Sequence, residues 1–201
     1  MIKSVYETQD EILNAINELH LDGKGYQCDI TYGNGGFWKN IQAPALKFDI
    51  TPLKDGVVAA TSTALPLLDK SLDNIVFDPP FITYVKKGRD HNSVIAKRFG
   101  GYETFDDLLT HYTQTLQETV RVLKRKGKLI FKCQDIVHNH QLRAVHAQVI
   151  MLAELVGFRL LDSFVLVAKH RMPVKTCMNS NNWKQRHARV FHSYFIVLEK
   201  I

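Results

Sequence analysis

Short apolar strands alternate with amphipathic helices along this chain, and no other feature of the sequence restricts its possible folds as strongly. Apolar residues recur at helical spacing over residues 8–21, 104–123 and 142–156, which predicts three helices. Runs rich in β-branched and aromatic residues, bounded by Gly, Pro or Asp, predict the strands between them. These strands are expected at 26–31, 45–50, 57–60, 74–77, 128–132, 158–167 and 193–198.

The ends of these segments and their order indicate the fold class. Thr104 can cap the second helix, and Gly127 and Gly157 are expected to end the second and third helices. Strands that alternate with helices favour an α/β domain whose mostly parallel sheet is covered by helices on both faces. Because no obvious helix joins the last two strands, they are expected to form an antiparallel hairpin at the sheet edge.

The composition indicates the size and the environment of the protein. With 201 residues, 45% of them hydrophobic, residues 1–201 are expected to form a single domain with a substantial core. The sequence has no N-terminal signal core and no apolar run that approaches a membrane span, so we expect a cytoplasmic protein with no membrane partner. Cys28, Cys133 and Cys177 form no CxxC pair, and no recognisable ligand set surrounds the histidines. Neither disulfides nor a metal site are therefore expected.

The chain is basic, with a formal net charge of +6 and a sequence pI near 9.2, which favours a polyanionic partner such as nucleic acid. Its basic residues gather in segments 82–101 and 169–189, together with aromatic residues that can stack on bases. We expect both segments to be loops that face nucleic acid, although two solvated loops would give the same composition. The candidate contact residues are Lys86, Lys87, Arg89, Lys97, Arg98, Lys169, Arg171, Lys184 and Arg186.

A Gly-rich turn follows the first predicted strand of the sheet, in the run Asp29-Ile30-Thr31-Tyr32-Gly33-Asn34-Gly35-Gly36. Its glycines permit tight turns and close approach of a ligand, and Asp29 can accept a hydrogen bond from a cationic amino group. Asp49, at the end of the next strand, lies where nucleotide-binding α/β folds place a carboxylate that binds ribose hydroxyls. NAD is a competing ligand, disfavoured because the turn reads GxGG rather than GxGxxG. Ordinary turns would also explain both features.

The run Asp78-Pro79-Pro80-Phe81 directly follows an apolar strand and is the most specific feature of the sequence. Two prolines remove two backbone donors, so the carboxylate of Asp78 and the nearby carbonyls form a site made of acceptors. Such a site can hold both N–H groups of an amino group on a planar base, with the nitrogen lone pair aimed at an electrophile. Phe81 offers a face on which an extruded base can stack. A rigid turn after a buried strand is the alternative interpretation.

With these motifs in place, the sequence resembles the amino-methyltransferases that methylate adenine N6 or cytosine N4 in DNA. The resemblance covers nearly the whole chain. The acidic residue and Gly-rich turn of that family resemble residues 29–36, its ribose-binding acid resembles Asp49, and its tetrapeptide (D/N/S)PP(Y/F/W) resembles residues 78–81. An aspartate in the first position of the tetrapeptide is commoner in enzymes that act on adenine, so adenine is the favoured acceptor.

The resemblance implies a Rossmann-like fold with a mostly parallel seven-stranded sheet and an antiparallel final strand. It also implies S-adenosylmethionine as the methyl donor and direct in-line transfer without a metal. The implied catalytic residues are Asp78, Pro79, Pro80 and Phe81. The family often has an acid near the adenine ring of the cofactor, where this chain has only hydroxyls. The implied cofactor-binding residues are Asp29, Thr31, Gly33, Gly35, Asp49 and, through those hydroxyls, Thr61 and Ser62.

One departure from the family keeps other functions open. Many DNA amino-methyltransferases carry a separate target-recognition domain, for which this chain has no room. Base readout is therefore assigned to the two basic loops, to a second copy in a homodimer, or to a separate specificity subunit. The alternatives to a DNA adenine methyltransferase are an RNA base amino-methyltransferase and a catalytically silent nucleic-acid-binding subunit with the same fold.

Overall fold

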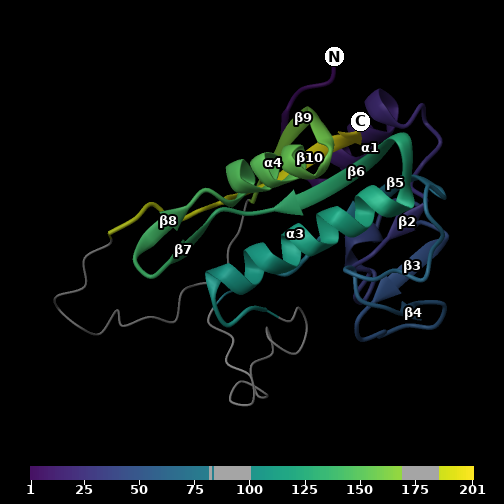
Figure 1. Ribbon diagram of the computed structural model, residues 1–201. Helices are drawn as coiled ribbons and strands as arrows, with labels where there is room; N and C mark the ends of the chain where they lie inside the picture. Colours follow the sequence, from purple (N-terminus) through teal and green to yellow (C-terminus); the bar gives the residue numbers. More distant parts are fainter. Residues whose placement is uncertain (82, 84–100, 169–185) are drawn as a thin grey trace.

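The computed structural model describes residues 1–81, 83, 101–168 and 186–201, and a sheet of eight strands runs through them (Figure 1). The strand order is β1-β9-β10-β6-β5-β2-β3-β4. The bounds are β1 Val5–Tyr6, β2 Cys28–Asp29, β3 Leu46–Asp49, β4 Val58–Ala59, β5 Leu72–Phe77, β6 Leu123–Cys133, β9 Phe158–Val167 and β10 His192–Lys200. Neighbouring strands are parallel, except that β10 is antiparallel to both β6 and β9. The expected mostly parallel sheet and its antiparallel last two strands are confirmed. The two-residue β1 adds an eighth strand to the seven expected, and it takes the edge position beside β9, where the last two strands were expected.

In the described part of the chain, three α-helices cover the sheet: α1 (Gln9–His20), α3 (Phe105–Val122) and α4 (Val145–Val156). Thr104 caps α3 as expected: its hydroxyl accepts from the Asp107 amide while the Asp107 carboxylate accepts from the Thr104 amide. α4 ends at Gly157, whose left-handed backbone (φ 108°) is a common helix terminator. None of the described helices is both long and apolar enough to cross a membrane.

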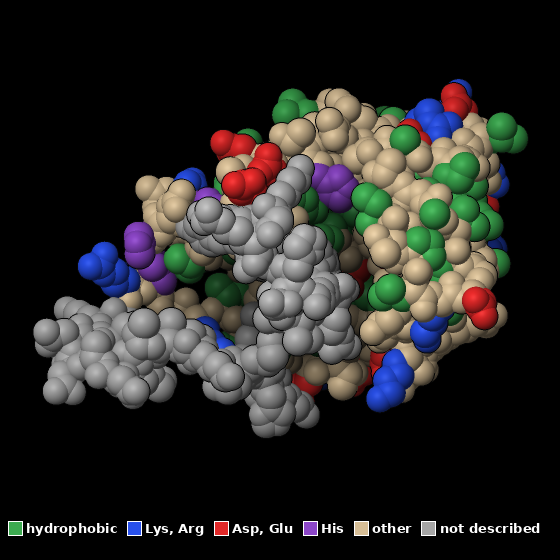
Figure 2. Space-filling model, turned by 90° about the horizontal axis from the view of Figure 1, so that it is seen from below, with side chains coloured by type: hydrophobic (Ala, Val, Ile, Leu, Met, Phe, Trp, Pro, Cys, Tyr) green, Lys and Arg blue, Asp and Glu red, His purple; other side chains and the backbone are tan. Residues whose placement is uncertain are grey.

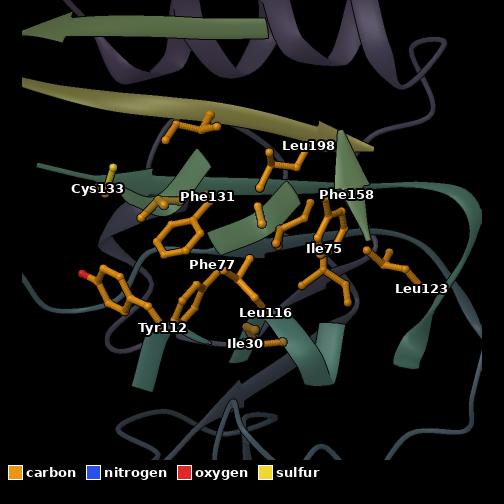
Figure 3. Packing of buried hydrophobic residues seen from close by; sticks show 14 of the residues in the cluster. Ile30, Ile75, Phe77, Tyr112, Leu116, Leu123, Phe131, Cys133, Phe158 and Leu198 are labelled. Atoms are coloured by element: carbon orange, nitrogen blue, oxygen red, sulfur yellow. The ribbon is translucent and has the colours of Figure 1, made fainter. Parts of the chain in front are cut away.

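Alternating side chains of the central strands build two cores, one on each face of the sheet. Val76 of β5 and Ile130 of β6 point toward α1, whereas Ile75 and Phe77 of β5 point toward α3 and α4. Figure 3 shows the second core, in which the rings of Phe77, Tyr112 and Phe131 lie together near the carboxyl end of β5. The expectation of helices on both faces is thereby confirmed (Figure 1).

Two boundaries differ from the sequence-based prediction. The helix expected to end at Gly127 ends at Val122, because Leu123 is fully buried and pairs with Leu72 of β5 at the start of the long strand β6. The helix expected from residue 142 begins at Val145. The residues before it form a hairpin of β7 (Ile136–His138) and β8 (Gln141–Arg143), which extends away from the main sheet in Figure 1.

Candidate active site

Three carboxylates meet at one edge of the sheet. β2 pairs in parallel with both β3 and β5, so the carboxyl ends of these three strands lie side by side. Asp29 ends β2, Asp49 ends β3, and Asp78 follows β5 directly. The carboxyl ends of strands are where open α/β sheets bind ligands, so the structure brings the three acids predicted from the sequence to the expected edge.

Asp29 is fully buried and holds the start of the Gly-rich turn. One carboxylate oxygen accepts from the indole Nε1 of Trp38 at 2.6 Å, and the other accepts from the Thr31 amide at 2.8 Å. Burial raises the pKa of Asp29 to about 7; the Trp38 and Thr31 hydrogen bonds oppose this rise, and the negative charge of Asp78 adds to it. Because the carboxylate has no exposed surface, its geometry makes Asp29 a residue that positions the turn.

The turn itself is fixed by Asp49 and by two glycines with left-handed backbones. The Gly33 amide donates to Oδ2 of Asp49 at 2.7 Å, and the Thr51 amide donates to Oδ1 at 2.8 Å. Gly35 has φ 74°, and a Cβ at this position would lie 2.9 Å from the Tyr32 hydroxyl. A residue with a side chain would be strained there both by its backbone and by its neighbour. Asp49 is half-buried and keeps lone pairs for a further donor.

The tetrapeptide is tied to this turn and to α3. The Asp78 amide donates to the Thr31 hydroxyl at 2.8 Å, and the Tyr112 hydroxyl donates to the Pro80 carbonyl at 3.2 Å. Tyr112 is fully buried and packs its ring against Phe77 and Phe131. The backbone of this segment is therefore held by hydrogen bonds at Asp78 and at Pro80, and the second bond comes from a tyrosine packed in the aromatic core.

The Asp78 carboxylate faces the ammonium group of Lys132, on the neighbouring strand β6, at 3.4 Å. Only 24% of the Asp78 side-chain surface is exposed. Burial raises the pKa of Asp78 above its ordinary value, and the positive charge and hydrogen bond of Lys132 oppose this rise. Within the described part of the chain, Lys132 is thus the cation that favours the charged form of this acceptor.

The two hydroxyl residues expected beside the cofactor ring follow β4. The buried Ser62 hydroxyl lies 2.9 Å from both Nε2 of His111 and the Thr115 hydroxyl. The His111 ring packs edge-on against Phe77, which brings this network close to the end of β5. Burial lowers the pKa of His111, so its neutral form is favoured. Thr61 is half-buried, and its hydroxyl lies 2.9 Å from that of Thr63.

Most of the basic residues expected to bind nucleic acid lie outside the described residues. Arg186 is described and exposed. Figure 2 shows the visible Lys and Arg side chains scattered over one face rather than gathered in one patch. Within the described part of the chain, no group of three or more His, Cys, Asp or Glu side chains is arranged to hold a metal ion. The basic residues outside the described ranges are Lys86, Lys87, Arg89, Lys97, Arg98, Lys169, Arg171 and Lys184.

Comparison with solved structures identifies the fold. A 1,6-didemethyltoxoflavin-N1-methyltransferase from Burkholderia thailandensis, with bound 1,6-didemethyltoxoflavin and S-adenosylhomocysteine, is 14% identical to this chain and gives a TM-score of 0.54. The match covers 96% of this chain and 79% of that enzyme. A SAM-dependent methyltransferase from Archaeoglobus fulgidus is also 14% identical, covers 96% and 95%, and gives 0.52. The chain has the Rossmann-like fold of S-adenosylmethionine-dependent methyltransferases. No family model and no curated protein sequence matches it.

A third comparison is weaker. A protein from Thermus thermophilus named "Putative DNA Modification Methylase" is 14% identical, covers 87% of this chain and gives a TM-score of 0.47. The chain spans about half the length of the three structures of that protein.

The sequence did not reveal three residues that shape the site: Lys132, Trp38 as the partner of Asp29, and Tyr112 beneath the tetrapeptide. Lys132 is the last residue of an apolar predicted strand, and the sequence alone predicts that such a lysine faces solvent. Its place beside Asp78 follows from the parallel register that pairs Phe77 with Phe131, one residue earlier on each strand. That register is a long-range property which local periodicity does not contain.

Proposed function

We propose that this protein is an S-adenosylmethionine-dependent methyltransferase that transfers a methyl group to the exocyclic amino group of a nucleic-acid base, with adenine N6 in DNA as the preferred acceptor. The observation that carries this proposal is the hydrogen bond between the Asp78 amide and the Thr31 hydroxyl. It joins the tetrapeptide expected to hold the amino group to the turn expected to hold the cofactor. The fold and the basic charge of the chain support the same function.

The residues at the strand ends fit S-adenosylmethionine. The turn at Gly33 and Gly35 presents backbone without side chains, and Asp49 retains acceptor capacity beside it for the ribose hydroxyls. The Thr61 hydroxyl is proposed to face the adenine ring, and Ser62 to support this segment through its buried contacts with His111 and Thr115. Asp29 with Thr31 is proposed to fix the turn on the methionine side. When bound, S-adenosylmethionine supplies an electrophilic methyl group on a sulfonium.

The tetrapeptide supplies the acceptor side of the reaction. The Asp78 carboxylate and the Pro79 carbonyl accept the two N–H groups of the amino group, which leaves the nitrogen lone pair free to attack in line. The charge of Asp78, whose side chain is mostly buried, stabilises the positive charge that develops on nitrogen. Pro80 keeps the backbone rigid, and Phe81 stacks on the base.

Nucleic acid is proposed to lie across segments 82–101 and 169–189. Their Lys and Arg side chains would neutralise phosphates, which makes affinity fall steeply with salt. Replacing the exposed Arg186 by Ala should then weaken DNA binding and reduce the slope of log affinity against log salt by about 1. We propose residues 1–201 as a single catalytic domain, with base readout completed by these segments, a second copy, or a specificity subunit.

Two measurements test the proposal. Calorimetric titration should detect S-adenosylmethionine with an affinity in the micromolar range, about −8 kcal/mol, and no NAD. Tritiated methyl groups should then enter unmethylated DNA, at adenine N6. Label found only in RNA would make the protein an RNA base methyltransferase. Binding of neither cofactor, with nucleic-acid binding intact, would make it a silent subunit.

A further inference from the structure

The groups around Lys132 hold its ammonium group close to the carboxylate of Asp78. Its ammonium lies 3.0 Å from Oε1 of Gln9, at the start of α1, and 3.4 Å from Oδ2 of Asp78. The rings of Phe37 and Phe195 lie 5.2 and 5.5 Å from the same ammonium, within the range of cation–π attraction. Only 15% of the side-chain surface is exposed.

Gln9 is itself oriented by a second hydrogen bond. Its Nε2 donates to the Phe37 carbonyl at 2.7 Å, which turns its oxygen toward Lys132. The lysine is thus fixed by elements on both sides, α1 and the segment after the Gly-rich turn. A buried ammonium with such partners is already positioned next to the Asp78 carboxylate, so no side-chain rearrangement is needed for the two groups to interact.

The charged and titratable groups that face Asp78 come from three elements of the described structure. β2 contributes the buried Asp29, whose negative charge interacts unfavourably with Asp78. α3 contributes Tyr112, whose pKa is raised by burial and further by the charge of Asp78, so it is neutral. β6 contributes Lys132, which among these residues carries the positive charge. Among these described groups, Lys132 is the one whose charge favours the carboxylate form of Asp78, against its burial.

We propose that Lys132 is a positioning residue that keeps Asp78 in its carboxylate form and turned toward the acceptor amino group. The inference rests on the proposed methyl transfer. A protonated Asp78 would turn one acceptor oxygen into an O–H donor and would lose the negative charge that stabilises the positive charge developing on the amino nitrogen, so methyl transfer would be slower. Lys132 would act through Asp78 without touching the base.

The test compares Lys132→Met, which keeps the bulk and removes the charge, with Lys132→Arg, which keeps the charge. Lys128→Met is the matched control, because Lys128 lies on the same strand, is similarly buried (16%), and pairs with Glu199 rather than Asp78. Methyl transfer is measured at saturating cofactor as a function of pH. For K132M the acid limb should move up by about one to three pH units, the range that an adjacent opposite charge supplies. K132R should restore the wild-type limb, and K128M should leave it unchanged.

A titration without turnover separates this inference from the proposed function. The carboxyl carbon of Asp78, followed by carbon-13 NMR, should titrate at higher pH in K132M than in wild type. In the wild type itself, the Cε resonance of Lys132 should report the same step, which tests the coupling even if K132M does not fold. Coincident Asp78 titrations in wild type and K132M, or a Lys132 resonance that ignores the Asp78 step, would overturn the inference. A wild type that methylates neither DNA nor RNA would overturn the proposed function alone.

Discussion

The backbone amide of Asp78 and the side-chain hydroxyl of Thr31 are joined by a hydrogen bond of 2.8 Å, although 47 residues separate them in the sequence. The backbone of Thr31 is in turn held by Asp29, whose carboxylate accepts a hydrogen bond of 2.8 Å from the Thr31 amide. The end of β2 and the end of β5 are therefore a single hydrogen-bonded unit. If the cofactor is bound by the first and the acceptor by the second, this bond sets the distance between them.

Replacing Thr31 by Val should loosen this unit. The change keeps the shape and leaves the Asp78 amide without its partner, so the free energy of unfolding should fall by about 1–2 kcal/mol. The rate of methyl transfer should fall more than the affinity for the cofactor, because the tetrapeptide that holds the acceptor loses its hydrogen bond to Thr31. Thr113→Val is the control, since the Thr113 hydroxyl donates within α3, to the Leu109 carbonyl, and not to the tetrapeptide residues that the structure describes. Equal effects of both variants on activity would contradict the linking role of Thr31.

Replacing Gly35 by Ala should weaken cofactor binding. The left-handed backbone costs about 1 kcal/mol with any Cβ, and the new methyl group must also displace the Tyr32 ring. Gly56→Ala is the matched control: its φ of 77° imposes the same backbone cost in a place where a Cβ meets no neighbour. Calorimetry with S-adenosylmethionine should show reduced affinity for G35A and unchanged affinity for G56A. Similar affinities for both variants would mean that the turn does not contact the cofactor.

The buried carboxyl of Asp29 should make stability depend on pH in a defined window. Its pKa is raised to about 7 in the folded protein, from 3.8 in an unfolded chain. Below pH 4 both states hold the proton, between pH 4 and 7 only the folded state keeps it, and above 7 both have lost it. Stability contributed by Asp29 is therefore lost as the pH rises from 4 to 7.

Denaturant unfolding of wild type and Asp29→Asn measures this contribution directly. Other titrating groups cancel in the difference between the two free energies of unfolding, whatever the baseline stability of the variant. The stability of wild type relative to D29N should decline from pH 4 to 7 and level off above. A difference that stays constant across this range would show that Asp29 ionises normally in the folded state.

Replacing Tyr112 by Phe should test the support beneath the tetrapeptide. The ring contacts with Phe77 and Phe131 remain, and the Pro80 carbonyl loses its donor, so the protein should fold with a loss of about 1 kcal/mol. Methyl transfer should decrease because the neighbouring Pro79 carbonyl is less firmly placed. Unchanged rates would indicate that the prolines alone fix this segment.

The main elements of the fold could be predicted from the sequence because their signals are local. The stripe of α3, its cap at Thr104 and the end of α4 at Gly157 each depend on residues close together in the chain. The end of α3 could not be predicted, because Leu123 leaves the helix to pair with Leu72, 51 residues earlier. The β7–β8 hairpin could not be predicted for another reason. Its turn residues Asn139 and His140 adopt positive φ values of 50° and 58°, and the turn contains no glycine, the residue that usually indicates such a conformation in a sequence.

The site was predictable where residue type alone implies chemistry, as for the three acids at strand ends and the two-proline run. It was not predictable where chemistry depends on register or burial. Asp29 was expected to face a cationic ligand group, and its oxygens instead bond to Trp38 and Thr31 in the interior. No sequence motif assigns a role to Lys132, and the parallel pairing of β5 with β6 places its ammonium group beside Asp78.

The central claim is that Asp78 holds the amino group during methyl transfer, and one comparison tests it most directly. The initial rate of tritiated methyl transfer to unmethylated DNA is measured for wild type and Asp78→Ala, with cofactor affinity measured in parallel. Asp73→Ala is the control, because Asp73 lies on the same strand and is exposed. We expect D78A to lose at least about a hundredfold in rate with its affinity for S-adenosylmethionine preserved, and D73A to retain activity. A wild-type rate in D78A would contradict the account.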